Sequence, residues 1–297
     1  MYKEIAIIAP TASGKTKLSI SLADKLNAVI LSLDSLAIYK EIDIASAKPT
    51  IKERQGIIHF GIDKILPNEN YDVIEFIQEY EKAKQYAQNN NKNLIIVGGT
   101  GFYLKSMIDG LSKVPKISQK TRDIVRDELK NINKIYEYLM SIDKNYMSNI
   151  SKNDKYRVEK AYELYLETNM IPSEFFESNK PEAIIKDIDI YEIETDVEIL
   201  RDRIKQRTNK MILDGIVDEV ISLEQKYSRG SNCMSSIGII ETFEYLDGKI
   251  DKKQLSELIS IHTAQLAKRQ RTFNKSQFKN VYKNKLENLE SKIISTF

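Results

Sequence analysis

The sequence predicts an α/β fold in which a parallel sheet forms the core and a helical domain is inserted into it. Short apolar runs at 5–8, 29–33 and 94–97 alternate with helix-like stretches, as in parallel sheets that are covered on both faces. Between Gly110 and Gly215 the chain has no glycine, which suits helices joined by simple loops. The 297 residues are 41% hydrophobic and 30% charged, so the chain can bury one large core or two smaller ones.

The first apolar run leads into a phosphate-binding motif. The residues from Ala9 to Thr16 read Ala-Pro-Thr-Ala-Ser-Gly-Lys-Thr, and a helix-like stretch follows at 17–25. A strand, a loop with Gly-Lys-Thr and a helix form the context of a P-loop. Its backbone N–H groups bind phosphate oxygens, Lys15 supplies a positive charge, and Thr16 offers a hydroxyl to Mg²⁺. By itself the motif indicates a nucleoside triphosphate as ligand, and the alternative is a strand–turn–helix that only happens to hold these residues.

One position departs from the motif, because Ala9 stands where the first glycine is usual. We expect alanine to be tolerated there as long as its φ is negative. The residues expected to surround the phosphate are Ala9, Pro10, Thr11, Ala12, Ser13, Gly14, Lys15 and Thr16.

The next two apolar runs also end in polar loops, and in a parallel sheet such strand ends share the edge where ligands bind. Asp34 follows the run 29–33 and would accept a proton from a nucleophile or bind Mg²⁺ through water. The alternative is a carboxylate that only caps the next helix. The run 94–97 leads into Gly-Gly-Thr-Gly at 98–101, where glycines allow close approach to a ligand and Thr100 offers a hydroxyl. A turn that only permits tight strand–helix packing is the alternative.

Helical spacing of apolar residues places most of the remaining elements. A helix is expected at 71–89, helical periodicity continues over 113–181, and a strand-like run returns at 188–193. Further helices are expected at 198–212, 216–226, 237–246 and 253–273. The chain is therefore expected to divide into a first core part at 1–112, a helical insertion at 113–185, and a core completion with a basic helical C-terminus at 186–297.

The composition excludes several classes of protein. Cys233 is the single cysteine, and His59 and His262 are the two histidines, which excludes a disulfide scaffold or a cysteine-based zinc site and argues against a histidine metal site. No apolar run approaches the length of a membrane span, and the N-terminus does not resemble a signal peptide. We therefore expect a cytoplasmic protein without a membrane partner, and nothing in the sequence indicates more than a monomer.

Positive charge is concentrated at the C-terminal end. The net charge is +2, but residues 262–297 carry eight Lys or Arg against Glu287 and Glu290, which is +6. A basic end on a nearly neutral protein indicates a polyanionic partner. A solvated helix face in a lysine-rich chain explains the charge about equally well.

Several segments together resemble the tRNA isopentenyltransferase (dimethylallyltransferase) family of P-loop proteins. They occur in the family's order from residue 9 to about residue 275, and in combination they are highly specific. The matching segments are 9–16, Asp34–Leu36, Ile38–Lys40, Ala47–Thr50, His59–Asp63, Val97–Leu104, Asn153–Asp154 with Arg157, Ser236–Gly238, Tyr245–Gly248 and Ala267–Gln270. The resemblance implies a P-loop NTPase-like core with a parallel sheet and an inserted helical domain.

The resemblance also implies a reaction. Members of the family transfer a dimethylallyl group from dimethylallyl diphosphate to N6 of an adenosine, leaving N6-isopentenyladenosine and diphosphate. That adenosine lies 3′-adjacent to the anticodon in tRNAs that read codons beginning with U. The implied catalytic residues are Asp34 as general base, Thr100 at the oxygen of the breaking bond, and Lys15 at the leaving diphosphate. Mg²⁺ at Thr16 is the implied cofactor.

Further positions are implied by the family motifs alone. Arg157 is expected to hold the diphosphate together with the P-loop. The residues expected to contact the anticodon loop of the tRNA are Asp34, Ser35, Leu36, Ala37, Thr100, Arg122, Tyr156, Arg157, Lys160, Lys268, Arg269 and Arg271. Two of these depart from the family: Ala37 replaces a glutamine that recognises the target adenine, and Lys160 replaces a second arginine. Adenine recognition must therefore depend more on backbone groups, shape and neighbouring residues.

Three other functions are compatible with parts of the sequence. A nucleoside or shikimate-type kinase shares the P-loop and the aspartate after the second strand, but it would hydrolyse or transfer ATP and would not need a basic tail. An adenylate isopentenyltransferase would use AMP, ADP or ATP as acceptor, and the helical insertion and basic tail argue for tRNA instead. An RNA-binding P-loop adaptor without activity would leave Asp34 and Thr100 without a role.

Overall fold

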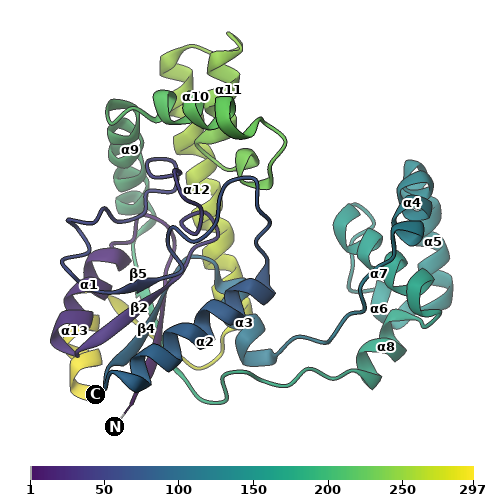
Figure 1. The fold of residues 1–297 in the computed structure, drawn as a ribbon, viewed down its shortest axis with the longest axis horizontal. Helices are drawn as coiled ribbons and strands as arrows, with labels where there is room; N and C mark the ends of the chain where they lie inside the picture. The colour runs from purple at the N-terminus through teal and green to yellow at the C-terminus, as the bar shows by residue number, and fades with distance from the viewer. Residues whose placement is uncertain (1) are drawn as a thin grey trace. The chain divides into compact units, whose positions relative to one another are not determined.

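The structure is a computed structural model that describes residues 2–297. The chain divides into two compact units (Figure 1). The first runs to Ser106 and resumes at Ile185–Phe297, and the second is Met107–Ile184. The insertion expected from the sequence was 113–185, so the second unit of the structure begins six residues earlier, within a helix, and ends one residue earlier.

A parallel sheet is the centre of the first unit. Its strands lie in the order β3-β2-β4-β1-β5-β6, and all neighbouring pairs are parallel. The strands are β1 (Glu4–Ile8), β2 (Ala28–Leu33), β3 (His59–Phe60), β4 (Asn93–Gly98), β5 (Asp189–Glu194) and β6 (Val281–Lys285). The α/β fold with a P-loop NTPase-like core that the sequence predicts is therefore confirmed. The strands β1, β2 and β4 are almost fully buried. Burial on both faces of the sheet explains why each is a continuous apolar run in the sequence.

Helices cover the sheet because alternate side chains of each strand point to opposite faces. On one face, Ile5, Ile30 and Ile95 pack with α1 (Lys15–Lys25) and α13 (Leu286–Thr296) into one core. Contacts with β2, β3 and β4 place α2 (Val73–Asn89) against the sheet as well, where it buries Phe76 and Tyr80. Asp72 caps α2 by accepting hydrogen bonds from the N–H groups of Ile74 and Glu75.

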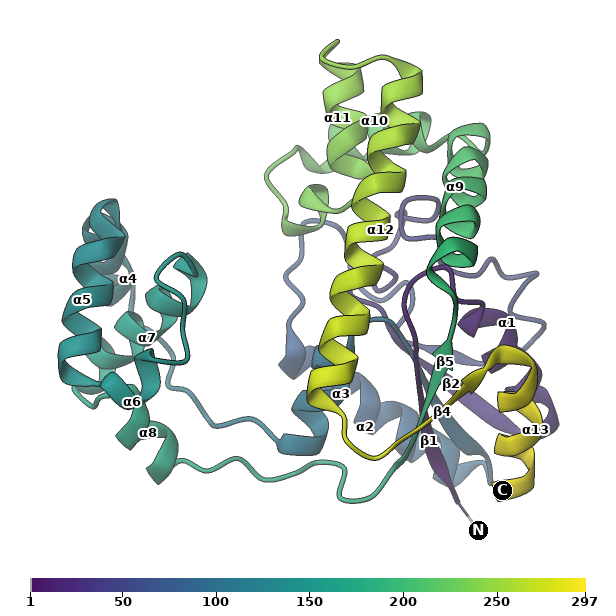
Figure 2. The same ribbon diagram turned by 180° about the vertical axis from the view of Figure 1, so that it is seen from behind.

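The C-terminal helices form a second core within the first unit. They are α9 (Val197–Leu213), α10 (Ile216–Tyr227), α11 (Ile239–Leu246) and α12 (Lys252–Gln277), with a short 3-10 turn η2 (Asn232–Ser235). Ile38, Ile42 and Ile216 belong to this core, so the loop that follows Asp34 is held by helices distant in sequence. Figure 2 shows that α12 extends from α10 and α11 at one end to the neighbourhood of α3 (Gly101–Asp109) at the other.

The second unit has a hydrophobic core of its own. Its helices are α4 (Gln119–Glu128), α5 (Ile132–Ile142), α6 (Lys144–Met147), α7 (Lys155–Thr168) and α8 (Pro172–Ser178), with the 3-10 turn η1 (Leu129–Asn131). Val125, Leu139 and Val158 are buried in that core. The helical spacing seen in the sequence therefore reflects burial within this unit.

The expectation that the chain is helical throughout after residue 193 is wrong at one element. The basic C-terminus contains the strand β6, which pairs with β5 along five positions from Ile190↔Val281 to Glu194↔Lys285. Its lysines make it look like part of a solvated helix, but the open edge of β5 supplies hydrogen-bond partners that the local sequence does not reveal.

No helix among the described residues combines the length and the apolar character needed to cross a membrane.

Candidate active site

The loop of residues 9–16 connects β1 to α1 at the carboxyl end of the sheet. Gly14 has a φ of 93° directly before α1, and Ala12 has a φ of 62°, so both adopt the left-handed region. Ala9 is buried and lies outside that region, as expected for an alanine at this position. The loop therefore has the alternating backbone that turns N–H groups toward a phosphate.

Lys15 begins α1 and folds back over the loop. Its Nζ donates to the carbonyl oxygen of Pro10 at 3.4 Å. Removal from water lowers the pKa of Lys15 to about 8, the nearby Arg207 also lowers it, and the negative charge of Asp34 opposes both effects. Lys15 is half-buried, and a cation that is already partly withdrawn from water gains more from an incoming phosphate than an exposed lysine does.

Asp34 uses its two carboxylate oxygens differently. Oδ1 accepts hydrogen bonds from the N–H groups of Leu36 at 2.9 Å and Ala37 at 3.2 Å. In the described part of the chain no helix begins between Asp34 and β3, so the helix cap considered from the sequence is wrong. The two hydrogen bonds instead stabilise the turn at 35–38, and they occupy one oxygen. Oδ2 accepts no hydrogen bond from the part of the chain that the structure describes, and Asp34 lines the same cavity as Lys15. The local backbone thus orients the carboxylate and leaves Oδ2 available for a proton or a water molecule.

The glycine-rich loop after β4 is held between the other two loops. The N–H of Thr100 donates to the carbonyl oxygen of Leu33 at 3.0 Å, and the N–H of Ala9 donates to that of Gly98 at 3.3 Å. A Cβ on Gly98 would overlap the backbone carbonyl of Leu33, so only glycine fits there. The loops that carry Lys15, Asp34 and Thr100 therefore lie next to one another, as the sequence predicts for strand ends of one sheet.

Two arginines that sequence reasoning missed also contact the P-loop. Arg207 donates from Nη1 to the Thr11 hydroxyl at 3.0 Å, and Arg203 donates from Nη1 to the Ser13 carbonyl at 3.2 Å. Burial lowers the pKa of Arg207, and the charge of Asp34 opposes that shift. Both arginines project from α9 with the i, i+4 spacing that brings side chains to one helix face. That spacing is visible in the sequence, but nothing local connects it with a loop about 190 residues earlier.

The cavity at this edge has a volume of about 70 Å³. Its lining includes Lys15, Thr16, Asp34, Ala37, Ser46, Lys48, His59 and Arg207. Lys48 ties its wall together, because its Nζ forms ion pairs with Asp43 at 2.7 Å and with Asp63. His59 Nδ1 lies 2.8 Å from the Ile57 carbonyl, and burial lowers the pKa of His59. Since Ala37 is buried without a polar side-chain atom, the cavity wall at that point is apolar.

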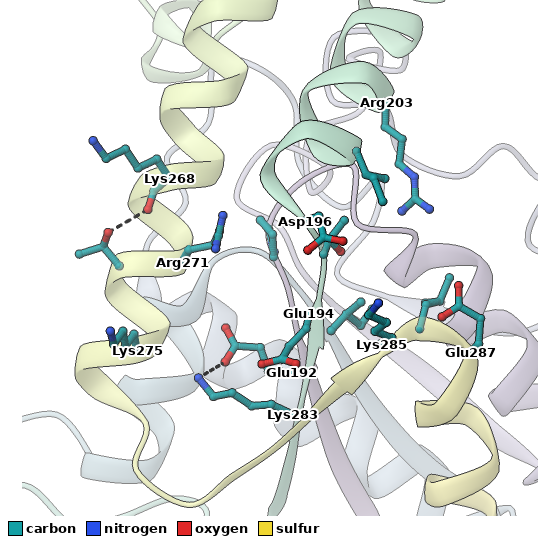
Figure 3. Close-up of a pocket in the computed structure, with 16 residues that line it drawn as sticks. Glu192, Glu194, Asp196, Arg203, Lys268, Arg271, Lys275, Lys283, Lys285 and Glu287 are labelled. Carbon is teal, nitrogen blue, oxygen red and sulfur yellow. Dashed lines mark hydrogen bonds and ion pairs between the residues drawn. The ribbon is translucent and has the colours of Figure 1, made fainter.

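A second and larger cavity, of about 700 Å³, lies on the same unit beside Pro10 and carries mixed charge. Figure 3 shows Lys268, Arg271 and Lys275 on successive turns of α12, and Lys283 of β6 reaching Glu192 of β5. The Lys283 Nζ lies 2.6 Å from Glu192 Oε2. By contrast, Lys268, Arg271 and Lys275 are exposed and form no ion pair with any of residues 2–297. They present uncompensated positive charge to solvent.

The structure places the remaining predicted residues in two groups. Arg269 is exposed on α12, in the first unit. Arg122 of α4 and Tyr156, Arg157 and Lys160 of α7 belong to the second unit. There Tyr156 is 69% exposed and lies beneath the Lys160 ammonium, which is 5.7 Å from the ring centroid. Arg157 is exposed and forms a 3.5 Å ion pair with Asp154.

The donor set near Thr16 fits a hard divalent cation. Magnesium takes few protein oxygens and completes its shell with water and phosphate. The Thr16 hydroxyl makes no hydrogen bond to another described residue, and Asp34 Oδ2 is available in the same cavity. Among residues 2–297, no cluster of three or more His, Cys, Asp or Glu could hold a metal by itself, so the cation would need a phosphate ligand.

The pKa of Lys15 predicts a pH dependence of anion binding. The protonated lysine attracts a diphosphate, so raising the pH through about 8 in the free protein should weaken binding. We expect the dissociation constant to increase by up to about tenfold per pH unit above that point. Titration calorimetry with a diphosphate ester from about pH 7 to about pH 10 measures it. The Lys15→Met variant should bind more weakly and lose this dependence, and a wild-type affinity that stays constant over the range would contradict the assignment.

Comparisons with known proteins agree on one family. Residues 37–277 match the model of the family described as IPP transferase. Among curated relatives, the tRNA dimethylallyltransferase of Aliarcobacter butzleri is 56% identical over 296 residues, with 99% of both chains covered. The tRNA dimethylallyltransferase of a Sulfurovum species is 52% identical over 289 residues, with 97% of this chain and 96% of the relative covered. The structure is similar to a tRNA delta(2)-isopentenylpyrophosphate transferase from Staphylococcus epidermidis, with a TM-score of 0.71 and 33% identity over 99% of this chain and 98% of that one. It is also similar to a eukaryotic dimethylallyltransferase acting on tRNA, with a TM-score of 0.83 and 27% identity over 97% of this chain and 75% of that one.

Proposed function

This chain belongs to the IPP transferase family, and we therefore propose that it is a tRNA dimethylallyltransferase. It transfers a dimethylallyl group from dimethylallyl diphosphate to N6 of the adenosine 3′-adjacent to the anticodon, in tRNAs that read codons beginning with U. The products are N6-isopentenyladenosine in the tRNA and diphosphate. The observation that carries the proposal is the carboxylate of Asp34, which is oriented by backbone N–H groups and keeps Oδ2 free beside Lys15.

Asp34 acts as the general base in this proposal. The N6 amine is a weak nucleophile because its lone pair is delocalised into the adenine ring. Attack on the allylic carbon forms the C–N bond and breaks the bond from that carbon to the diphosphate oxygen, which leaves with the electron pair. The proton lost by N6 goes to Asp34 Oδ2, the oxygen that the backbone does not occupy.

The P-loop stabilises the leaving diphosphate. Its charge develops as the carbon–oxygen bond breaks, so fixed donors at that position lower the barrier. Lys15 and Arg207 supply positive charge, and the loop amides supply hydrogen bonds. Bound Mg²⁺ at Thr16 would neutralise further negative charge on the phosphates. The hydroxyl of Thr100 would donate to the bridging oxygen, and a contact of Arg157 with the diphosphate stays a prediction.

The RNA partner must present its adenosine outside the base stack. Anticodon-loop bases are only partly stacked, so turning one out costs little. The exposed cations of α12, Lys268, Arg269 and Arg271, would hold backbone phosphates. On the second unit, the exposed Tyr156 offers a ring for stacking and Arg122 and Lys160 offer further charge. The monomeric state and the cytoplasmic location stay predictions, which gel filtration and cell fractionation test.

Incubation with labelled dimethylallyl diphosphate and Mg²⁺ tests the function. We expect label to enter unmodified tRNA and not AMP. Label in AMP instead of tRNA would identify an adenylate isopentenyltransferase. Label in neither acceptor, together with turnover of ATP, would identify a kinase and overturn the proposal.

The contribution of α12 to RNA binding is testable through salt. Each of Lys268→Gln and Arg271→Gln should weaken binding to an anticodon stem-loop and reduce the slope of log K against log salt by about 0.7–0.9. Filter binding across a salt series measures the slope. Lys253→Gln is the matched control, because Lys253 is exposed on the first turn of the same helix and faces Glu257 at 4.0 Å. Equal slopes for all the variants and the wild type would remove α12 from the RNA interface.

A further inference from the structure

The helix α12 presents two different faces over its last turns. Lys268, Arg271 and Lys275 are exposed. Ala267, Gln270 and Asn274 follow with the same three- and four-residue spacing, and of these Ala267 and Asn274 are almost completely buried. Because residues at i, i+3 and i+7 share a helix face, the charged residues and the inward residues form adjacent stripes. One short segment therefore meets solvent on one side and the interior of the site on the other.

Gln270 contacts two of the three loops of the site. Its Oε1 accepts a hydrogen bond from the N–H of Thr11 at 2.9 Å, so it holds the first turn of the P-loop. Its side-chain amide also packs directly against Gly99, where a Cβ would overlap Nε2 and lie 3.0 Å from Cδ. One side chain therefore fixes the distance between the loop that carries Lys15 and the loop that carries Thr100.

One turn further along, Asn274 extends this contact. Its Oδ1 lies 2.8 Å from the position that a Cβ on Gly101 would occupy, and its Nδ2 donates to Glu192 Oε1 at 3.4 Å. Glu192 in turn pairs with Lys283 of β6. Oδ1 of Asn274 is buried and has no hydrogen-bond partner among residues 2–297, so the packing is close but its polar groups are incompletely satisfied. A small movement of α12 would therefore change the contacts of both loops.

We propose that Gln270 is a positioning residue that couples RNA binding on α12 to diphosphate binding by the P-loop and the glycine loop at 98–101. The inference rests on the proposed function. RNA phosphates that contact Lys268 and Arg271 bias the position of the helix, and Gln270 transmits that bias to Thr11 and Gly99. Since coupling between two sites is reciprocal, diphosphate binding must strengthen RNA binding by the same factor. Dimethylallyl diphosphate is then bound most tightly when the acceptor RNA is present, which limits loss of the prenyl group to water.

The coupling is measured as a ratio of dissociation constants. Binding of an unreactive dimethylallyl diphosphate analogue is titrated with and without a saturating anticodon stem-loop RNA. For the wild type we expect the RNA to tighten binding at least about fivefold, the lower end of usual allosteric couplings. For Gln270→Met, which keeps the length of the side chain but loses both hydrogen-bonding groups, the ratio should fall to about one. In turnover at saturating RNA, KM for the donor should rise by the factor that the ratio loses.

A matched control separates coupling from stability. Gln265→Met makes the same chemical change at an exposed position of the same helix, and its ratio should equal that of the wild type. If Gln270 were only structural, its replacement would lower Tm and weaken both ligands without changing the ratio. A wild-type ratio in a folded Gln270→Met variant overturns the inference. Failure of the wild type to bind either ligand overturns the proposed function instead.

Hydrogen exchange on the wild type keeps the test independent of how the variant folds. Addition of the stem-loop RNA alone, without any diphosphate, should slow amide exchange in peptides that cover residues 9–16, none of which is expected to contact the RNA. Unchanged exchange in these peptides, under conditions where the RNA is bound, would also overturn the inference.

Discussion

Replacement of Asp34 by alanine is expected to lower kcat for prenyl transfer to tRNA by about 10³-fold, within the range of about 10²–10⁴ that a general base contributes. Binding of dimethylallyl diphosphate and of tRNA should change far less, because Lys15, the P-loop amides and the cations of α12 remain in place. Single-turnover rates together with separate equilibrium titrations of both ligands measure this split.

The Asp34→Asn variant distinguishes a general base from a residue that only stabilises the turn at 35–38. Asparagine keeps an oxygen that can accept from the N–H groups of Leu36 and Ala37, but it cannot take up a proton. If Asp34 is the base, both variants lose activity to a similar extent. Near-normal turnover of Asp34→Asn, with a loss confined to Asp34→Ala, would reduce Asp34 to a structural residue.

Replacement of Gly98 by alanine is the second change with a large expected effect. The new Cβ would overlap the carbonyl group and the Cβ of Leu33, and a backbone carbonyl cannot rotate away as a flexible side chain can. We expect the free energy of unfolding to fall by about 3 kcal/mol, at the upper end for overpacked cores. Because Leu33 directly precedes Asp34 and its carbonyl accepts from Thr100, activity should be lost even in the fraction that folds.

Denaturant unfolding of Gly98→Ala, followed by circular dichroism, measures the loss of stability. Gly230→Ala is the control, because Gly230 is exposed and the nearest atom to its added Cβ is the Ser228 hydroxyl at 3.9 Å. That variant should unfold like the wild type within about 0.5 kcal/mol. Equal stability of the two variants would contradict the prediction, because the strands around Leu33 would then accommodate the added Cβ without a loss of folding free energy.

Much of the site was predictable because its signals are local. A P-loop, an aspartate after a strand and a glycine-rich turn can each be recognised within a few residues of sequence. Parallel strands then bring their carboxyl ends to one edge of the sheet. The contacts of Arg203, Arg207 and Gln270 with the P-loop could not be predicted, because their partners lie about 190 to 260 residues away in sequence. From sequence alone, an arginine or glutamine on a helix is predicted to be exposed to solvent. Its contacts become known only when the fold is known.

The strand β6 illustrates the same limit for secondary structure. Its sequence, Val-Tyr-Lys-Asn-Lys at 281–285, has a weak alternation and many lysines. The pairing with β5 supplies the hydrogen bonds that make it a strand. A strand at the edge of a sheet is defined by its neighbour more than by its own propensity.

The α/β core, the helical insertion and the P-loop follow from the sequence, because each depends on short-range spacing and residue chemistry. The catalytic roles of Asp34 and Lys15 stay predictions, and how their side chains are held depends on the packed fold. In the folded protein, one carboxylate oxygen of Asp34 accepts hydrogen bonds from the backbone and Arg207 lies near Lys15. Gln270 contacts both the P-loop and the glycine loop at 98–101. These are contacts between residues far apart in the chain, and their geometry exists only once the sheet and its helices have packed.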